Sequence, residues 1–389
     1  MPVEGNRQRR RFVNLARQFR GGHPCYVAPV TGEILKLLRP EKNPALQVAK
    51  QGLWIAEDGQ GRVRGRIAAT FDPRHAESLG EGAGWFGFFD ADDAATTGFL
   101  VQHAWQWLQQ QGATTMLGPA DPDTNHECGC LVKGFDEIPY LMMPHQPAEY
   151  GTWLQQAGLI KAKDLLALET VADGFPLERL QPVVERSLQR GGFRLESITK
   201  KNLQAKLEEV RMIYNDSWRQ NWGFLPMTKE EFHFEAEGLK FLLNPGLAQI
   251  AYRGDEAAGF ILGAADLNLA LHAIGSRLFP FGILRLPFLM KKIRRLRTIA
   301  LGVRPAFRQR GLEVALVYTL TRNGLNQGFN QAEMSWVLED NQAMLGLAKA
   351  LKGRVSRRYR LFRPGPGFPA DQKLSAAGSV PPGSEDVPE

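Results

Sequence analysis

An internal repeat of predicted elements constrains the fold of this chain more than any other feature of its sequence. Residues 53–72, LWIAEDGQGRVRGRIAATFD, alternate around a glycine-containing turn and predict a β-hairpin. Residues 248–268, AQIAYRGDEAAGFILGAADLN, have the same plan. Each hairpin is followed, in the same order, by a strand, a helix, a short strand, a second helix and a closing strand. Because a match of this many elements in order is unlikely to arise by chance, the chain is predicted to contain two similar halves.

The elements after each hairpin show helical or strand periodicity in turn. In the first half they are residues 84–90, 94–112, 113–119 and 149–169; in the second they are residues 297–303, 312–324, 332–338 and 342–363. This order predicts an α/β fold of two tandem units, each with a mixed, mostly antiparallel central sheet flanked by helices. A further helix over 199–218 is expected, with Thr199 as its N-cap.

The predicted domains are residues 1–175 and residues 190–363, and the join is expected within 170–192, where VADGFP and RGGF interrupt the pattern. Residues 364–389 are rich in proline, glycine, serine and alanine. A segment of this composition cannot bury enough apolar surface to offset its ordering entropy, so we expect a disordered tail.

Composition limits the cellular setting and the partners. The chain has 389 residues, of which 43% are hydrophobic and 23% charged, as in globular proteins. Three cysteines are too few for a disulfide framework, and no apolar run suits a signal peptide or a transmembrane helix, so a cytoplasmic location is expected. The net charge of +7 favours anionic partners: a phosphorylated cofactor, nucleic acid or an acidic membrane surface.

The positive charge is clustered in three places. One cluster lies in the first twenty residues, one between Arg285 and Arg297, and one between Lys352 and Arg363. The middle cluster overlaps residues 279–297, FPFGILRLPFLMKKIRRLR, where apolar and basic residues mix. A helix on a membrane surface and a covering segment inside the domain are both open interpretations, and the proline at 287 and the position between two strands favour the second.

Residues 302–316, GVRPAFRQRGLEVAL, place arginines and a glycine between a predicted strand and a predicted helix. One interpretation is a phosphate cradle, because the first amides of a helix lack carbonyl partners and glycine lets backbone approach a ligand closely. Arg308 and Arg310 would add charged donors. The alternative is a charged turn that only begins a helix.

With these residues the sequence resembles the GNAT-type N-acetyltransferases, in which the acetyl-coenzyme A loop has the pattern Val-x-Pro-x-x-[Arg/Gln]-x-x-Gly-x-[Gly/Ala]. Val303, Pro305, Arg308 and Gly311 match, and Glu313 departs from the pattern. The whole chain is also similar to tandem GNAT-like bacterial proteins through its GRIAA, GFDEIP and NWGF segments. The resemblance implies acetyl-coenzyme A, or another acyl-coenzyme A, as co-substrate and no metal. The residues it implies for cofactor binding are Leu301, Val303, Arg308, Gln309, Arg310, Gly311, Leu312, Glu313 and Asn341.

The first half has no comparable loop. Asp90, Asp92 and Asp93 stand between its strand and its helix, where they would repel a diphosphate, so we expect this half to be non-catalytic and the acids to cap a helix. HECGC at 126–130 lacks the second ligand pair of a zinc site, so ordinary thiols are expected there.

Acyl transfer to an amine also needs an acceptor pocket and proton-transfer groups. Asp266 and Glu339 each end a predicted strand and are the candidate catalytic carboxylates, with a surface role as the alternative. The family's helix tyrosine is absent, because the expected position is Ala348; Tyr214 and Tyr359 are the remaining candidates. The residues expected to line an acceptor pocket, or else to cover the core, are Trp218, Asn221, Trp222, Phe224 and Asn268.

These features predict an acyl-coenzyme A-dependent acyltransferase, of the N-acetyltransferase type, acting on a small-molecule or amine acceptor. Two alternatives remain open. One is a non-enzymatic GNAT-like protein whose basic clusters bind an anionic partner, and the other is a Fem-like aminoacyl transferase. Nucleic acid and a membrane surface are less favoured partners.

Overall fold

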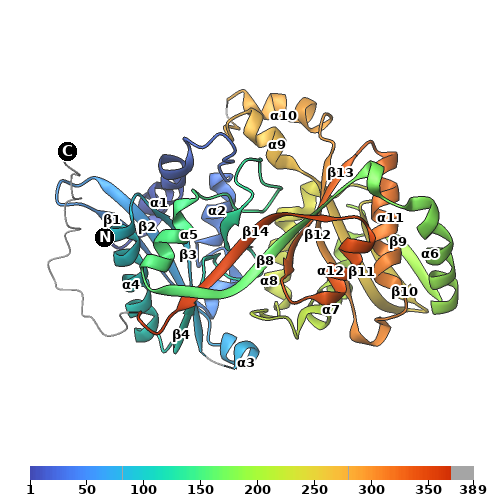
Figure 1. Ribbon diagram of the computed structural model, residues 1–389, viewed down its shortest axis with the longest axis horizontal. Helices are drawn as coiled ribbons and strands as arrows, with labels where there is room; N and C mark the ends of the chain where they lie inside the picture. Colours follow the sequence, from blue (N-terminus) through green and yellow to red (C-terminus); the bar gives the residue numbers. More distant parts are fainter. Residues whose placement is uncertain (81, 279, 369–389) are drawn as a thin grey trace, which may run out of the picture. The chain divides into compact units, whose positions relative to one another are not determined.

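The computed structural model describes residues 1–80, 82–278 and 280–368 (Figure 1). Its contacts divide the chain into two compact units, and neither is continuous in sequence. The first unit contains Met1–Phe135, Pro144–Asp164 and the chain from Tyr359 onward; the second contains Asp136–Met143 and Leu165–Arg358. The domain boundaries drawn from sequence, 1–175 and 190–363, stay predictions, and most of the expected disordered tail lies outside the described residues.

The first unit is built on a sheet with the strand order β1-β2-β3-β4. Antiparallel pairing joins β1 to β2 and β2 to β3, whereas β3 and β4 are parallel. Its elements are α1 (Gly5–Arg20), α2 (Thr31–Leu37), η1 (Pro44–Gln47), β1 (Lys50–Glu57), β2 (Val63–Phe71), α3 (His75–Leu79), β3 (Ala83–Ala91), α4 (Ala94–Gln110), β4 (Thr115–Leu117), β5 (Ala120–Asp121), β6 (Glu127–Cys128), β7 (Cys130–Lys133) and α5 (Glu149–Gln156).

The second unit has the strand order β14-β8-β13-β12-β11-β10-β9. β9, β10, β11 and β12 are antiparallel neighbours, and β12 and β13 are parallel. Its elements are β8 (Leu159–Val171), η2 (Ala172–Gly174), α6 (Leu177–Gly191), β9 (Phe193–Ser197), α7 (Leu203–Trp218), α8 (Lys229–Leu239), η3 (Lys240–Leu242), β10 (Ala248–Arg253), β11 (Glu256–Ala265), α9 (Leu267–Ala273), α10 (Gly282–Met290), β12 (Arg295–Val303), η4 (Pro305–Phe307), α11 (Leu312–Asn326), β13 (Gln331–Leu338), α12 (Gln342–Ala350) and β14 (Arg354–Pro364). β8 and β14 each contribute one end to the first unit.

The predicted α/β class is confirmed, and so is the repeated order of elements. In both units a hairpin is followed by a third antiparallel strand, a helix and a parallel strand. The first series is β1, β2, β3, α4 and β4, and the second is β10, β11, β12, α11 and β13. A parallel pair needs a crossover connection, and α4 and α11 supply it.

Two local predictions differ from the structure. Thr199 is not the N-cap of α7: that residue is Asn202, and the Thr199 hydroxyl instead donates to the Asn202 side chain at 3.1 Å. Residues 170–192, interpreted as the join between halves, contain α6, which packs on α11 in the second unit through Val184, Ala315 and Tyr318.

Apolar helices cover both faces of the second unit's sheet. On one face α11 packs against Ile261 and Leu296; on the other α7 packs against Phe260 and Ala300. Alternating residues of a strand point to opposite faces, so this arrangement assigns each strand residue of the site to the α11 face or the α7 face.

No helix within the described ranges is both long enough and apolar enough to cross a membrane.

Candidate functional site

The parallel strands β12 and β13 separate part-way along their length. Their pairing begins at Arg295 opposite Gln331 and ends at Thr298 opposite Met334. β12 nevertheless continues to Val303, and β13 continues to Leu338. The sheet therefore opens between the two strands beyond Thr298.

The backbone of β12 presents hydrogen-bonding groups to this opening. The Arg304 amide points toward β11, where it donates to the Ala258 carbonyl at 2.9 Å. Because backbone groups of successive strand residues point in alternate directions, the amides of Val303 and Leu301 point away from β11, toward the opening. The Val303 carbonyl also points away from β11, since it accepts from the Arg308 side chain at 3.1 Å.

The loop after β12 turns sharply into α11. It contains the short helix η4 and two residues with left-handed backbone, Gln309 (φ +62°) and Gly311 (φ +77°). Gly311 is the N-cap of α11, and it has no side chain that could cap the helix. The first amides of α11 therefore keep their capacity to bind an anion.

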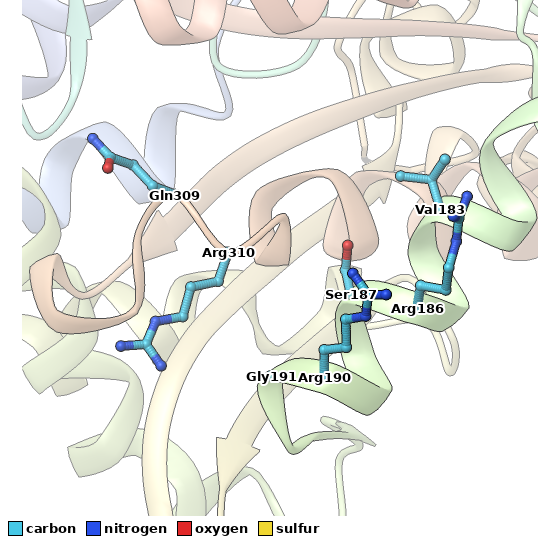
Figure 2. A pocket seen from close by; sticks show the side chains of 7 residues that line it. All are labelled: Val183, Arg186, Ser187, Arg190, Gly191, Gln309 and Arg310. Atoms are coloured by element: carbon cyan, nitrogen blue, oxygen red, sulfur yellow. The ribbon is translucent and has the colours of Figure 1, made fainter.

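A basic hollow of about 600 Å³ lies beside this helix start. Figure 2 shows Gln309 and Arg310 projecting from the loop and the other lining side chains on α6. The residues of α6 that line it are Val183, Arg186, Ser187, Arg190 and Gly191. Three arginines thus line one hollow, and two of them come from α6, a helix not expected from the sequence.

Gly311 is closely approached by α6. A Cβ atom at this position would lie 2.6 Å from the Ser187 hydroxyl oxygen. A larger residue here would therefore collide with α6, and not only with a ligand at the loop.

The other predicted cofactor residues occupy several environments. The Arg308 guanidinium donates to the Val303 carbonyl and, at 2.6 Å, to the Ser217 carbonyl at the end of α7, so it fastens the loop to α7. Leu312 is fully buried in the α11 core, and Glu313 is half-buried in the first turn of α11. The Asn341 side chain caps α12, where it accepts from the Met344 amide at 3.1 Å.

A buried polar network lies on the α7 face where β12 and β13 separate. Glu333 stands opposite Arg297, one position before the pairing ends, and Ser335 is the first residue of β13 beyond it. The Ser335 hydroxyl donates to Glu333 at 2.7 Å, and Arg297 donates to the Ser335 hydroxyl oxygen at 3.1 Å. Arg357 of β14 forms an ion pair with Glu333 at 2.9 Å. Burial raises the pKa of Glu333, against the attraction of Arg357.

Asp266, a predicted catalytic residue, is completely buried at the start of α9. Its Oδ1 accepts from the amides of Leu141 and Asn268, at 2.8 and 3.2 Å. Its Oδ2 forms an ion pair with an Arg295 nitrogen at 2.8 Å, although the two atoms are not aligned for a hydrogen bond. Burial raises the pKa of Asp266 to about 6, against the attraction of Arg295. These contacts fasten residues 136–143 to α9.

Residues 136–143 cover the polar face of the sheet. The Ile138 carbonyl accepts from Arg295 at 3.0 Å and from Arg357 at 3.1 Å. The Arg295 guanidinium carbon lies 3.9 Å from the centre of the Tyr140 ring. Asn268, predicted to bind an acceptor, donates to the Tyr140 carbonyl at 3.1 Å. The polar side chains of this face therefore join a segment distant in sequence to the sheet.

The predicted acceptor residues Trp218 and Phe224 pack in an aromatic cluster. Trp218 contacts Tyr214, Phe224 and Phe260, with ring centres 4.1, 6.3 and 6.2 Å apart. Asn221 and Trp222 lie in the turn between α7 and Phe224, and both are half-buried. These contacts correspond to the core-covering interpretation; binding of an acceptor by the same residues stays a prediction.

The other proton-transfer candidates lie apart in sequence and environment. Glu339 is half-buried immediately after β13. Tyr214 belongs to the aromatic cluster, and Tyr359 is fully buried in β14, in the first unit. Ala348 is buried in α12. The roles assigned to Glu339 and the two tyrosines stay predictions.

The acidic residues of the first unit bind arginines. Asp93 caps α4 by accepting from the Thr96 amide at 2.7 Å, and Arg64 lies 2.9 Å from Asp92 and 2.8 Å from Asp93. Asp90 is buried between Arg20 and Arg66.

The cysteines occupy two environments. Cys128 and Cys130 are buried, and Cys25 is half-buried. Among the residues that the structure describes, no group of three or more His, Cys, Asp or Glu residues is arranged to hold a metal ion.

Five residues of the site were not expected from the sequence: Arg186, Arg190, Arg297, Glu333 and Ser335. The last three had a signal, because charged and polar residues inside otherwise apolar strands need partners when they are buried. Arg186 and Arg190 had none beyond helical spacing.

Comparison with known proteins defines the family. No family model matches the chain. Over 372 residues it is 32% identical to the bacterial ceramide synthase of Caulobacter vibrioides (strain NA1000 / CB15N), and the match covers 93% of this chain and 96% of that protein. The chain belongs to the same family. Protein YghO of Escherichia coli (strain K12) is a second member, 32% identical over 332 residues, covering 82% of this chain and 84% of that protein.

Solved structures show that this chain has the GNAT fold. A tandem GNAT protein from the clavulanic acid biosynthesis pathway matches 93% of this chain and 97% of its own, with a TM-score of 0.56 and 12% identity. A GCN5-related N-acetyltransferase from Anabaena variabilis ATCC 29413 matches 93% and 71%, with a TM-score of 0.51 and 12% identity. The predicted resemblance is therefore confirmed for the fold.

Proposed function

We propose that this protein is an N-acyltransferase that transfers an acyl group from a coenzyme A thioester to the amino group of a long-chain amino alcohol, forming an amide. The observation that carries this proposal is the opening between β12 and β13 together with the basic hollow at the start of α11. The acceptor class is suggested by the name of the Caulobacter relative, since a ceramide is the N-acyl amide of a long-chain amino alcohol.

The residues present suit coenzyme A at one end of the opening. A diphosphate and a further phosphate need several cationic donors, and Arg186, Arg190 and Arg310 surround one hollow at an uncapped helix start. An extended pantetheine chain needs amide partners, and Val303 and Leu301 direct theirs into the opening. Arg308 holds the loop in place through the Val303 and Ser217 carbonyls.

A thioester bound in this way supplies an electrophilic acyl carbon near the point where the strands separate. There the C–N bond forms, the C–S bond breaks, the amine loses a proton and the sulfur leaves as a thiolate. Ser335 and Glu333 lie at the end of the strand pairing and form a hydrogen-bonded pair that could receive the amine proton. Asp266 and Glu339 remain the alternatives for this role.

The proposal is tested by calorimetric titration and by an acyl-transfer assay. Titration with acetyl- and palmitoyl-coenzyme A, and with dephospho-coenzyme A, measures recognition of the acyl chain and of the phosphates. The assay combines palmitoyl-coenzyme A with sphinganine and detects free thiol and amide. We expect amide formation, and weaker binding without the 3′-phosphate. Failure to bind any acyl-coenzyme A would reject the proposal.

Matched variants identify the binding site. Arg186→Gln combined with Arg190→Gln is expected to weaken coenzyme A binding at least tenfold, because each charge-assisted hydrogen bond contributes about 1.5–3 kcal/mol. Arg179→Gln is the control, since Arg179 is exposed on the same helix but does not line the hollow. An equal effect of the control and the double variant would locate the site elsewhere.

Ser335→Ala tests the proton path. If Ser335 connects the amine to Glu333, this variant lowers kcat and shifts the acidic limb of the pH–rate profile, while coenzyme A affinity stays near that of the parent. An unchanged kcat and pH profile would assign the proton transfer to another group.

A further inference from the structure

The helix α10 of the second unit exposes a stripe of large apolar side chains. Phe281, at its N-cap, is 72% exposed, and Leu284 and Phe288 are 67% and 70% exposed. The i, i+3, i+7 spacing places these three residues on one face of the helix. Ile283, also exposed, extends the apolar surface. These four residues and the cations described below are called the α10 patch.

This concentration of apolar surface is local. The described chain has twelve large hydrophobic residues that are exposed, and four of them lie in the eight residues from 281 to 288. Isolated apolar residues on a surface need no explanation, but a contiguous patch indicates an interaction site.

The start of α10 is fixed by packing, which bears on the exposed stripe. α10 contacts α9 in the second unit (Figure 1). Gly282 is buried, and a Cβ atom there would lie 1.9 Å from the Arg277 carbonyl oxygen. With the helix start fixed in this way, Phe281, Leu284 and Phe288 are exposed.

Exposed cations flank the stripe along the chain. Five exposed cations belong to the α10 patch: Arg277, Arg285, Lys291, Lys292 and Arg294. The sequence has no Asp or Glu between Leu267 and Leu312, so the surrounding chain supplies no compensating negative charge. The remaining arginines of this basic cluster, Arg295 and Arg297, point into the buried network instead.

We propose that the α10 patch binds the surface of a bilayer that contains anionic lipids, with the apolar stripe in the headgroup–acyl boundary and the cations at the lipid phosphates. Amphipathic segments with Phe and Leu on one face and Lys or Arg beside it bind membranes in this way. A nine-residue helix rises about 14 Å, roughly half the hydrocarbon thickness, and so can only lie on the surface.

Charge distinguishes this partner from two others. A second copy that met the patch about a two-fold axis would place five cations against the same five cations, which is repulsive. Nucleic acid would satisfy the cations but leave the Phe281–Leu284–Phe288 stripe in water. An anionic bilayer satisfies both parts of the patch.

Vesicle flotation with the full chain tests the proposal. Vesicles of phosphatidylcholine alone are compared with vesicles that also contain phosphatidylglycerol, at low and high salt, without acyl donor or amine. We expect binding to the anionic vesicles that decreases with salt, and little binding to the neutral ones. Because coenzyme A titration needs no lipid, failure here and failure of the proposed acyl transfer can be distinguished.

Paired variants separate the patch from the rest of the surface. Leu284→Ser with Phe288→Ser, and Lys291→Gln with Lys292→Gln, should each weaken vesicle binding roughly tenfold or more, since each surface cation contributes about 1 kcal/mol. The controls are Phe241→Ser and Lys200→Gln with Lys201→Gln, exposed residues outside the patch. Unchanged melting temperatures establish that the variants fold.

Three outcomes would overturn the proposal. The parent protein could fail to bind anionic vesicles, or the controls could weaken binding as much as the patch variants. Alternatively, Leu284→Ser with Phe288→Ser could convert a dimer to a monomer in lipid-free buffer and leave vesicle binding unchanged, which would show that a second copy covers the patch.

Discussion

Gly311 illustrates how a single residue in the loop serves packing as well as binding. Its φ of +77° is a left-handed conformation that glycine adopts without strain, and the Ser187 hydroxyl oxygen lies only 2.6 Å from where a Cβ atom would be. A substitution here therefore changes the stability of the fold before it changes any contact with a ligand.

Gly311→Ala is expected to lower the free energy of unfolding by about 1–3 kcal/mol, through left-handed strain and contact with Ser187. Gly98→Ala in α4 is the control, because nothing lies within 4 Å of a Cβ atom there and alanine should stabilise the helix by about 0.5–1 kcal/mol. Urea unfolding measures both. If the two substitutions change the free energy of unfolding by equally small amounts, α6 can move away from the loop with little loss of stability.

Asp266 provides a prediction on pH. Its pKa of about 6 in the folded protein lies above the ordinary 3.8, so the folded state binds the proton more tightly than the unfolded state. The contribution of Asp266 to stability is therefore fully present below about pH 4 and is lost as the pH rises through 6. The free energy of unfolding of the parent, relative to that of Asp266→Asn, should therefore decrease as the pH rises from about 4 to above 6.

Urea unfolding at several pH values checks this expectation, with Asp255→Asn, at an exposed position, as the control. A constant difference between the parent and Asp266→Asn from pH 4 to pH 7 would mean that burial does not shift this carboxyl.

At the scale of elements, the proposed phosphate site depends on two helices that meet. α11 contributes its uncapped N-terminus, and α6 contributes two arginines from its side. The positive end of the α11 dipole favours an anion, and Glu313 in the first turn competes for it.

Glu313→Gln should therefore tighten coenzyme A binding by roughly two- to fivefold. The negative charge of Glu313 near the diphosphate weakens the complex by about 0.5–1 kcal/mol, and the substitution removes that charge. The increase should shrink at high salt. Calorimetry at two ionic strengths measures it, and weaker binding by the variant would indicate that Glu313 contacts the ligand favourably.

At the scale of the whole molecule, the two units share an order of elements but differ at the corresponding loop. The loop before α11 is basic and contains glycine, whereas the loop before α4 contains Asp92 and Asp93 paired with Arg64. The proposal assigns the coenzyme A site to the second unit alone.

Asp92→Lys should consequently leave coenzyme A affinity within about twofold of the parent, because the proposed site draws on residues of the second unit and independent sites have additive effects. Thermal unfolding accounts for any loss of stability from the broken pair with Arg64. A larger loss of affinity in a folded variant would mean that the acidic loop contributes to the site.

Sequence reasoning predicted the elements with strong local periodicity. The two hairpins, the helices α4 and α11 and the strand–loop–helix context of Gly311 are in place, because alternation and helical spacing encode them within a few turns of chain. It did not predict α6, because VADGFP and RGGF interrupt the pattern at its two ends, although Leu177, Leu180, Val184 and Leu188 have helical spacing. The roles predicted for individual site residues stay predictions.

The sequence by itself determined the fold class, the order of the elements and the position of the loop at 304–311. Only the tertiary structure decided that Arg186 and Arg190 would line one hollow with Arg310, that residues 136–143 would cover Arg295 and Arg357, and that large apolar side chains of α10 would be exposed. The reason is physical: local patterns state which face of an element is apolar, whereas the partner that covers a face is chosen by packing among segments far apart in the chain.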